Sequence, residues 1–381
     1  MSRLTAPPLL VVENFAPSVG GVETFNRALL SAWADRVDAG SDRAGTILIA
    51  PESRAWIERE APAIARAFTI PELPTGRTAL LDAALAQIAS NEPPSAVAIL
   101  RASKRLSPIL VKAQRAGIPS VVYVHGRTST FDRWPPRFWW RKRTQMHRAT
   151  RVATNSEWMA KNLEKVGHPR AQVDVIPLGI DPERFSPDPV RRAWERDSAS
   201  LGDAPLLVTV SRLVGAKGHG RVLEAVHALL PEFPNLRWWI VGDGPSRAEL
   251  EEMIETAGVE HAVKLLGSLP DPTGPLSAAD LFVLLAEDEA FGLAALEAEA
   301  MGVPALVLAG SGLEEIVRDG VTGSVLPRDP VAIREGLRAW IEDRARREKA
   351  GTAARTLAAG YTWERTTDRF ISLLESVRVD R

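Results

Sequence analysis

The segment PLLVTVSRLVGAKGHGRVLEAVHALL (Pro205–Leu230) contains an apolar run, a glycine-containing loop and a stretch with helical spacing, in that order. The run Pro205–Val210 predicts a buried strand, and a helix is predicted near Arg221–Leu230. The loop between them, SRLVGAKGHG, carries two cations and three glycines. A strand followed by a loop and a helix is the repeating part of a βαβ unit, so this segment predicts a parallel sheet.

The same alternation extends over most of the chain. Further strands are predicted at Leu9–Phe15, Thr46–Ala50, Ala96–Leu100, Ser120–Val124, Val152–Thr154, Val173–Pro177, Leu236–Val241, Val263–Gly267, Leu281–Leu285 and Pro304–Leu308. Helical spacing is present at Val22–Val37, Ala79–Ser90, Glu157–Val166 and Ser246–Ala257. Strands that alternate with helices of this length favour an α/β fold with helices on both faces of each sheet.

One segment interrupts the alternation and predicts a domain boundary. PLGIDPERFSPDP (Pro177–Pro189) has four prolines in thirteen residues, which a long helix does not tolerate. We therefore predict a first domain at residues 1–178, a hinge or linker at 179–204 and a second domain at 205–360. Ligands of such sheets bind beyond the carboxyl ends of the strands, and the cleft between two domains is the expected site.

Composition excludes several classes of protein. A chain of 381 residues with 45% hydrophobic residues suits two globular domains. The chain has no cysteine, so it forms neither a disulfide framework nor a thiolate metal site, which fits a reducing cytoplasm. No secretory signal and no apolar run of about 18 residues are visible, so no membrane-spanning helix is expected.

Two loops that follow strands are candidates for phosphate binding. In SRLVGAKGHG, the cations Arg212 and Lys217 at the start of a helix suit a diphosphate, although an ordinary basic loop would look the same. In VGDGPSRAEL, Gly242 and Gly244 form a G-x-G, but the third glycine of a dinucleotide fingerprint is replaced by Arg247. A tight turn is therefore the alternative for the second loop.

The amino-terminal half offers two further candidates. Gly20 and Gly21 lie between the first strand and the first helix, where a ligand loop and a structural turn are both reasonable. His125 follows the predicted strand Ser120–Val124, at the position where functional groups lie in such folds, with Arg127 close behind.

Two glutamates follow the predicted strand Leu281–Leu285. Glu289 precedes a helix and Glu297 lies about two turns along it, so the pair could share a face or contact different parts of one long ligand. For Glu299, on the same helix, we predict a solvated position.

In order and spacing, these segments resemble family 4 of the retaining nucleotide-sugar glycosyltransferases, which have the GT-B architecture. The resemblance rests on PSVGGVE, VIPLGIDPERFSP, SRLVGAKG, VGDGP, the Glu289–Glu297 segment and EEIVRDGVTG. It implies two Rossmann-like domains that face each other across a cleft. It also implies that a carboxyl-terminal helix at about 361–381, which contains Trp363, crosses back to the first domain.

The resemblance implies roles for the candidate residues. Arg212 and Lys217 would hold the donor diphosphate, Glu289 the sugar hydroxyls and Glu297 the ribose hydroxyls. His125 would lie near the reacting carbon, so the catalytic group would be His125, Glu289, Arg212 and Lys217. The other donor contacts would come from Gly20, Gly21, Gly242, Phe291, Gly292 and Leu293.

The activity implied is transfer of a hexose-type sugar from a UDP-, GDP- or ADP-sugar to a glycan, lipid-linked or small-molecule acceptor, with retention. A role in glycan, cell-envelope or glycolipid biosynthesis would follow. Two cations would neutralise the departing diphosphate, so no metal or other cofactor is expected. The sequence departs from the family's usual Pro-Ser at LLAEDE and from its double glycine at Ser311-Gly312, which leaves the sugar open.

Other functions remain as alternatives. A GT-B sugar-nucleotide epimerase or hydrolase would bind the same donor, and a non-catalytic nucleotide-sugar-binding protein would share the fold. The intact set Arg212, Lys217, Glu289 and Glu297 argues against a degenerate scaffold.

A basic segment precedes the middle of the chain. Residues 101–151 contain thirteen Lys or Arg and one acid, and WPPRFWWRKRTQMHR (Trp134–Arg148) adds three tryptophans. Such a mixture suits an acceptor site or an anionic membrane surface, for which the candidate residues are Arg127, Arg141, Lys142 and Arg143. We therefore expect a cytoplasmic protein, with peripheral binding at the inner face of the membrane as a hypothesis. No motif predicts nucleic-acid binding.

Overall fold

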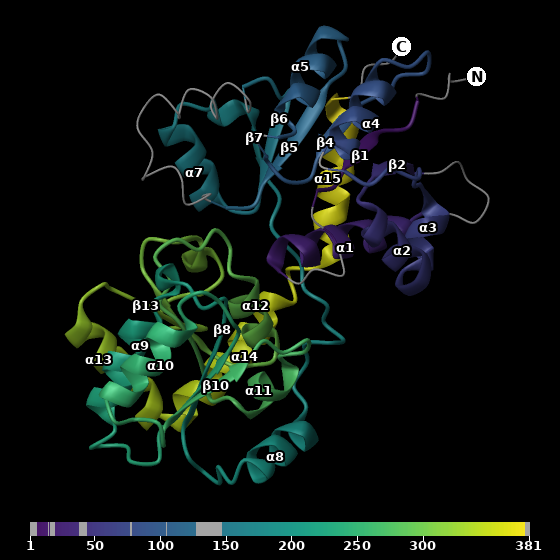
Figure 1. Cartoon of the computed structure of the whole chain (residues 1–381). Helices are drawn as coiled ribbons and strands as arrows, with labels where there is room; N and C mark the ends of the chain where they lie inside the picture. Colours follow the sequence, from purple (N-terminus) through teal and green to yellow (C-terminus); the bar gives the residue numbers. More distant parts are fainter. Residues whose placement is uncertain are drawn as a thin grey trace. The chain divides into compact units, whose positions relative to one another are not determined.

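The computed structural model describes residues 6–13, 15, 20–37, 44–76, 78–103, 105–126 and 147–377 (Figure 1). The chain forms two compact units. The first lies within residues 1–179 and 363–381, and the second is residues 180–362. The structure thus assigns residues 180–204, for which the sequence predicts a linker, to the second unit.

The described part of the first unit holds a parallel sheet with the strand order β3-β2-β1-β4-β5-β6-β7. The strands are β1 (Leu9–Val11), β2 (Gly45–Leu48), β3 (Phe68–Thr69), β4 (Val97–Ile99), β5 (Ser120–Val124), β6 (Arg151–Thr154) and β7 (Val173–Val175). The helices are α1 (Gly21–Ala34), α2 (Pro51–Glu60), α3 (Pro62–Ala67), α4 (Ala79–Ile88), α5 (Ser107–Arg115), α7 (Glu157–Lys165) and α15 (Trp363–Val377). Strands β1 and β5 are buried along their whole length, as expected of strands covered on both faces.

Helix α15 ends the chain but packs in the first unit, against α1 (Figure 1). Its buried Phe370 meets Trp33 of α1, with ring centroids 6.3 Å apart. Arg36 also forms an ion pair with Asp368 at 2.8 Å. The prediction of a carboxyl-terminal helix that returns to the first domain is confirmed. Trp363, at the start of α15, lies 6.3 Å from the ring of Phe25, in line with a structural role.

The second unit holds a six-stranded parallel sheet with the order β10-β9-β8-β11-β12-β13. The strands are β8 (Leu206–Val210), β9 (Arg237–Val241), β10 (Val263–Gly267), β11 (Leu281–Leu284), β12 (Ala305–Leu308) and β13 (Gly323–Leu326). The helices are α8 (Pro189–Ser198), α9 (His219–Leu229), α10 (Arg247–Thr256), α11 (Thr273–Ala278), α12 (Leu293–Ala300), α13 (Pro330–Glu342) and α14 (Arg344–Ala358). The predicted α/β fold with two doubly wound sheets is confirmed.

The strand order places a topological switch at β8. The chain first runs outward through β9 and β10, and then crosses to the other side of β8 to form β11. The loops that follow β8 and β11 therefore leave neighbouring strands at the same edge of the sheet. In open α/β sheets, ligands bind at such a point.

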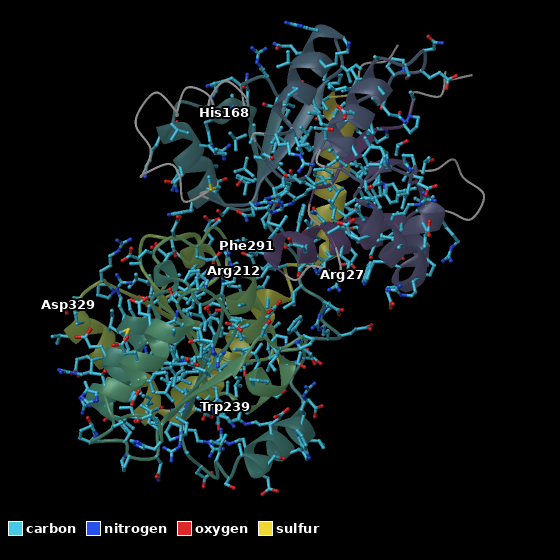
Figure 2. The ribbon with its side chains drawn as sticks, in the orientation of Figure 1. Arg27, His168, Arg212, Trp239, Phe291 and Asp329 are labelled. Carbon is cyan, nitrogen blue, oxygen red and sulfur yellow. The ribbon has the colours of Figure 1, made fainter. Side chains whose placement is uncertain are left out.

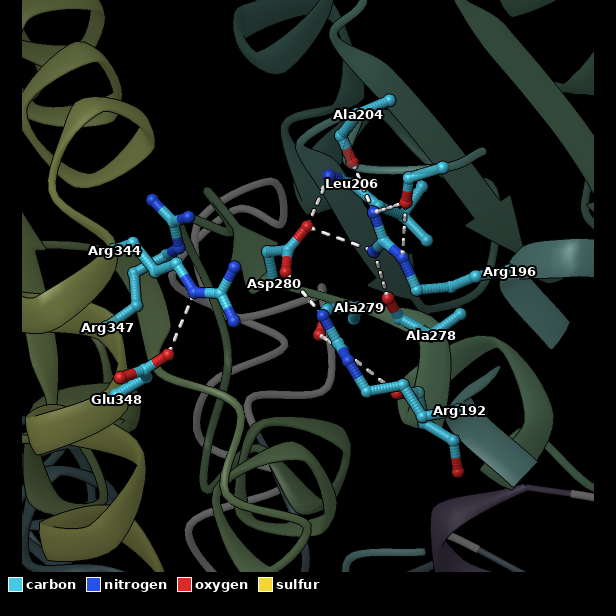
Figure 3. Close-up of polar contacts among 12 residues, drawn as sticks. Arg192, Arg196, Ala204, Leu206, Ala278, Ala279, Asp280, Arg344, Arg347 and Glu348 are labelled. Carbon is cyan, nitrogen blue, oxygen red and sulfur yellow. Dashed lines mark hydrogen bonds and ion pairs between the residues drawn. The ribbon is translucent and has the colours of Figure 1, made fainter. Parts of the chain in front are cut away.

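Helix α8 lies in the segment that the sequence predicts as a linker, but it is fixed to the sheet (Figure 3). The Asp280 carboxylate, just before β11, accepts hydrogen bonds from Arg192 at 2.6 Å and from Arg196 at 3.2 Å. It also accepts one from the backbone N–H of Leu206 at 2.9 Å. These contacts make α8 part of the second unit and attach it to the amino ends of β8 and β11, whereas ligands bind beyond the carboxyl ends of such strands.

Candidate functional site

The main candidate site lies where the loops after β8 and β11 meet in the second unit. The ammonium group of Lys217 forms an ion pair with the Glu289 carboxylate, although 72 positions separate them in the sequence. The other Glu289 oxygen accepts a hydrogen bond from the backbone N–H of Ala290 at 3.1 Å. Both side chains are about four-fifths buried. The structure therefore brings together two of the predicted catalytic residues.

Arg212 supplies a second positive charge on the loop after β8. Its side chain is exposed, and no hydrogen bond or ion pair joins it to a residue that the structure describes. Figure 2 labels Arg212 and Phe291 at the same end of the second unit. An exposed guanidinium near a helix start is available for an anion, and its planar donors suit phosphate oxygens.

Helix α12 begins in the loop that carries Glu289. Gly292 caps this helix with a φ of 95°, which only glycine adopts without strain, and a Cβ there would lie 2.2 Å from a Leu313 methyl group. The ring of Phe291 is buried and lies edge-on to Tyr361, with centroids 6.0 Å apart. The amides of Phe291, Gly292 and Leu293 donate no hydrogen bond to a residue that the structure describes, as is usual at a helix start. They can therefore donate to an anion.

Glu297 lies on α12 and is partly buried. Burial raises its pKa to about 7; the positive charge of Arg184 opposes this rise and the negative charge of Asp271 adds to it. Arg184 and Asp271 themselves form an ion pair at 3.2 Å. Near neutral pH, Glu297 therefore exists in both protonation states, and a ligand that hydrogen-bonds to its oxygens would shift the balance.

Three glycines allow the loops of the site to approach one another. Gly218 has a φ of 75°, and a Cβ there would lie 2.0 Å from the Leu285 carbonyl oxygen. Gly242 and Gly244, after β9, are equally close to the loop after β8, where Cβ atoms would lie 1.8 Å from the Ser211 oxygen and 2.4 Å from the Leu213 oxygen. Gly242 therefore has a clear structural role, and its donor contact stays a prediction.

Two other contacts at this site have no signal in the sequence pattern. His219, at the start of α9, is buried, and its Nε2 lies 3.0 Å from the Ser211 hydroxyl. Burial, helped by the nearby charge of Lys217, lowers the His219 pKa to about 4, so the ring is neutral at pH 7. Arg221, also on α9, forms an ion pair with Glu287.

The prediction that Glu299 is solvated is wrong. This residue on α12 has no exposed surface, and its Oε1 accepts a hydrogen bond from the Thr322 hydroxyl at 2.7 Å. Burial raises its pKa to about 8; the Thr322 bond and the charge of Arg318 oppose that rise. Glu299 is thus a buried carboxyl that is mostly protonated at neutral pH.

In the first unit, His125 follows β5 and is held on several sides. Its ring stacks on Tyr123, with centroids 4.5 Å apart, and lies edge-on to Phe25 at 4.7 Å. Its Nε2 lies 2.7 Å from the Leu100 carbonyl oxygen. Because a carbonyl only accepts, Nε2 carries the proton, and Nδ1 keeps a lone pair that can accept from a hydroxyl.

The same environment keeps His125 uncharged. Burial lowers its pKa to about 4; the hydrogen bond to Leu100 opposes this effect and the charge of Arg101 adds to it. A neutral imidazole at pH 7 can orient a ligand hydroxyl, but it does not supply a positive charge.

The other predicted residues of the first unit lie at the start of α1 or outside the described residues. Gly20 is the N-cap of α1 and Gly21 is its first residue. The glutamate Glu23 approaches Gly20, where a Cβ would lie 2.5 Å from its Oε2. The acceptor or membrane candidates Arg127, Arg141, Lys142 and Arg143 lie outside the described residues.

The structure also bears on metals and membranes. Within the described ranges, no three side chains of the His, Cys, Asp or Glu type gather where they could hold a metal ion. No helix in those ranges combines the length and apolar character needed to cross a bilayer.

Comparison with known protein families identifies the chain. Residues 19–184 match the family described as "Glycosyltransferase Family 4", and residues 190–357 match the family described as "Glycosyl transferases group 1". Together the two matches cover most of both units. The chain belongs to glycosyltransferase family 4. Its two doubly wound units have the GT-B architecture of this family, as the resemblance implied.

Curated relatives of this family member carry specific names. The chain is 33% identical over 224 residues to a GDP-mannose-dependent alpha-(1-6)-phosphatidylinositol monomannoside mannosyltransferase from Mycolicibacterium smegmatis. It is 34% identical over 238 residues to a D-inositol 3-phosphate glycosyltransferase from Geodermatophilus obscurus. These alignments cover 56% and 59% of this chain, and 59% and 52% of the relatives. The matches thus span just over half the length of the relatives.

Solved structures share the fold over nearly the whole chain. HepE from Anabaena, solved in complex with UDP, has a TM-score of 0.81 at 19% identity, and the match covers 97% of this chain and 100% of HepE. A sucrose-phosphate synthase from Thermosynechococcus elongatus has a TM-score of 0.78 at 20% identity, with 97% and 98% coverage. At this identity the likeness shows the fold alone.

Proposed function

We propose that this family member is a retaining glycosyltransferase that moves a hexose-type sugar from a nucleoside diphosphate sugar to a hydroxyl group. One observation carries the proposal: Lys217 and Glu289 pair at the topological switch of the second unit. An exposed Arg212 lies on the same loop as Lys217, and α12 begins four residues after Glu289. This arrangement offers cations and N–H groups for a diphosphate, and a carboxylate for hydroxyl groups.

Each residue has a distinct role in the proposed reaction. The bond between the anomeric carbon and the diphosphate oxygen breaks, so negative charge grows on the leaving diphosphate. Arg212 and Lys217, together with the amides at the start of α12, stabilise that charge. Glu289 orients the sugar through its hydroxyls, and Glu297 accepts hydrogen bonds from the ribose.

The acceptor hydroxyl forms the new bond on the face from which the diphosphate departs, and its proton passes to the departing phosphate oxygen. This route gives retention and needs no separate carboxylic acid as proton donor. His125, whose Nε2 contact to Leu100 leaves Nδ1 as the acceptor nitrogen, would accept a hydrogen bond from a donor hydroxyl. Because Arg212 and Lys217 supply positive charge, we propose that the reaction needs no metal ion.

The nucleotide and the acceptor are proposed as classes. A curated relative is named as GDP-mannose-dependent, and structural neighbours were solved with UDP or UDP-glucose, so GDP- and UDP-sugars come first and ADP-sugars next. The names of the relatives include a phosphatidylinositol mannoside and an inositol phosphate, which support a glycan, a lipid-linked sugar or a small polyol as acceptor. We propose a role in glycan, cell-envelope or glycolipid synthesis.

The test is a transfer assay with UDP-, GDP- and ADP-sugars and a panel of polyol and glycolipid acceptors, in the presence of EDTA. Proton NMR of the product would give the anomeric configuration. The proposal expects one donor class to react with retention, and Glu289→Gln to lower the rate by about 100-fold or more. A product of inverted configuration would contradict the retaining mechanism. Donor cleavage without transfer to any acceptor would favour a hydrolase, and binding without cleavage would favour a non-catalytic protein.

We also propose that the protein acts in the cytoplasm, at the inner face of the membrane. The support is the segment Trp134–Arg148, which mixes tryptophans with cations. Sedimentation with vesicles that contain 30% phosphatidylglycerol, at physiological salt, should recover the protein with the lipid. Recovery no greater than with neutral vesicles would rule out this membrane role.

A further inference from the structure

The loop after β11 carries three consecutive acids, Glu287, Asp288 and Glu289. In the proposed function this loop lies at the binding site of a diphosphate, which is itself an anion. Carboxylates near a bound diphosphate weaken its binding, because like charges repel more strongly where water is partly excluded. The site can bind an anion tightly only if nearby cations balance these acids.

Two cations four residues apart meet two of the acids. Lys217 pairs with Glu289, and Arg221 on α9 pairs with Glu287. The two loops are also joined by their backbones, because the N–H of Glu287 donates to the Ala216 carbonyl at 3.1 Å. Glu287 is thus held next to the loop that carries Lys217, and without a partner it would compete with Glu289 for that lysine.

Stability does not explain the Arg221–Glu287 pair, because the two side chains are 33% and 41% exposed and ion pairs this exposed contribute little to stability. The two loops are already fixed by the Ala216 hydrogen bond and by the close approach of Gly218 to Leu285. The pair does place a positive charge on Glu287, next to the loop that carries Lys217.

We propose that Arg221 is a positioning residue for the donor diphosphate. It holds and neutralises Glu287, so that Lys217 meets only Glu289 and the diphosphate. This inference rests on the proposed donor site and adds a residue that does not itself touch the donor. Glu287 lies in the segment LLAEDE, where the sequence departs from the usual Pro-Ser of the family, and Arg221 would be the residue that makes this acid acceptable.

The test is a double-mutant cycle on nucleotide binding. The dissociation constants of UDP, GDP and ADP would be measured by isothermal titration calorimetry on the full chain, for wild type, Arg221→Leu, Glu287→Gln and the double variant. We expect Arg221→Leu to weaken the best-bound nucleotide roughly three- to tenfold, because it exposes the diphosphate to an unpaired carboxylate. Glu287→Gln in the Arg221→Leu background should restore binding to within about twofold of wild type. Arg221→Lys, which keeps the charge, should also bind nearly as well as wild type.

A second ion pair provides the control. Arg338 and Glu232 are 41% and 47% exposed, and their pair joins α13 to the turn that follows α9 in the same unit. Arg338→Leu should leave the dissociation constant within about twofold of wild type. The inference would be overturned if Arg338→Leu lost as much nucleotide affinity as Arg221→Leu. It would also be overturned if the double variant bound nucleotide as weakly as Arg221→Leu.

The inference and the proposed function fail in different ways. If wild type binds a nucleotide and Arg221→Leu binds it equally well, only the positioning role of Arg221 is lost. If wild type binds none of the three nucleotides at millimolar concentration, the donor site itself is contradicted, and the role of Arg221 is lost with it. Melting temperatures of all variants within about 2 °C of wild type would show that the fold is intact.

Discussion

The buried carboxyl of Glu299 should make the stability of the protein fall as the pH rises. The pKa of Glu299 is raised above its ordinary value, so the folded chain holds a proton that the unfolded chain releases. The associated stability is fully present below pH 4.5, the ordinary pKa, and is lost as the pH rises towards the folded value of about 8. Replacement by glutamine removes this titration and keeps an oxygen that can accept from Thr322.

The size of the effect follows from the pKa. The rise from 4.5 to about 8 corresponds to an upper bound of about 5 kcal/mol, since one pKa unit is worth about 1.36 kcal/mol. Structural relaxation and water entry reduce this cost, so we expect about 2–3 kcal/mol. The buried amide nitrogen of Glu299→Gln has its own cost, but that cost does not depend on pH. The informative quantity is therefore how the difference in stability between Glu299→Gln and wild type changes with pH.

The assay is thermal unfolding of wild type and Glu299→Gln between pH 5 and pH 9, followed by circular dichroism. We expect the melting temperature of the variant, relative to wild type, to rise by roughly 5–10 °C over this range. Glu252→Gln, at an exposed position of α10, is the matched control and should show no such trend. If the melting temperatures of Glu299→Gln and wild type differ by the same amount at every pH, Glu299 does not carry a raised pKa in the folded protein.

Three further predictions concern the site and its supports. Nucleotide affinity should fall as the pH drops from 8 to 6, because protonation removes the negative charge that strengthens the hydrogen bonds accepted by Glu297. Calorimetry should show a flatter pH profile for Glu297→Gln. Gly218→Ala should lower the free energy of unfolding by about 2 kcal/mol or more and weaken nucleotide binding, because its Cβ would meet the Leu285 carbonyl. Gly258→Ala, at a similar φ in open space, should cost only about 1 kcal/mol and leave binding unchanged. Phe370→Ala should lower the free energy of unfolding by about 3–5 kcal/mol in urea denaturation, because it empties a fully buried position where α15 packs in the first unit.

Much of the fold was accessible from the sequence because buried parallel strands are continuous apolar runs. Strand β5 is found at the predicted residues, Ser120–Val124. Strand β13 was missed because Gly323 and Ser324 break its apolar run, and β3 because it is only two residues long. Helix α8 is missed because none of its residues is fully buried, and its half-buried face carries charged residues instead of apolar ones. Hydrogen bonds from Arg192 and Arg196 to Asp280 hold the helix.

The sequence predicts those parts of the candidate site that lie at the carboxyl ends of strands. Parallel strands bring their carboxyl ends to one edge, so Lys217 and Glu289 could be expected to meet across 72 positions. The error for Glu299 has a different origin. Helix α12 is rich in alanine and has no polar face, so its pattern does not show which acid is buried, and the partner Thr322 lies 23 positions further on.

We propose above that the second unit binds a nucleoside diphosphate through Arg212 and Lys217. The most direct measurement is a thermal-shift titration with UDP, GDP and ADP in the presence of EDTA, on wild type and on the double variant Arg212→Ala/Lys217→Ala. One nucleotide should raise the melting temperature of wild type in proportion to the logarithm of its concentration, and the double variant should show no shift. The absence of a shift in wild type at millimolar nucleotide, or an equal shift in both proteins, would contradict this proposal.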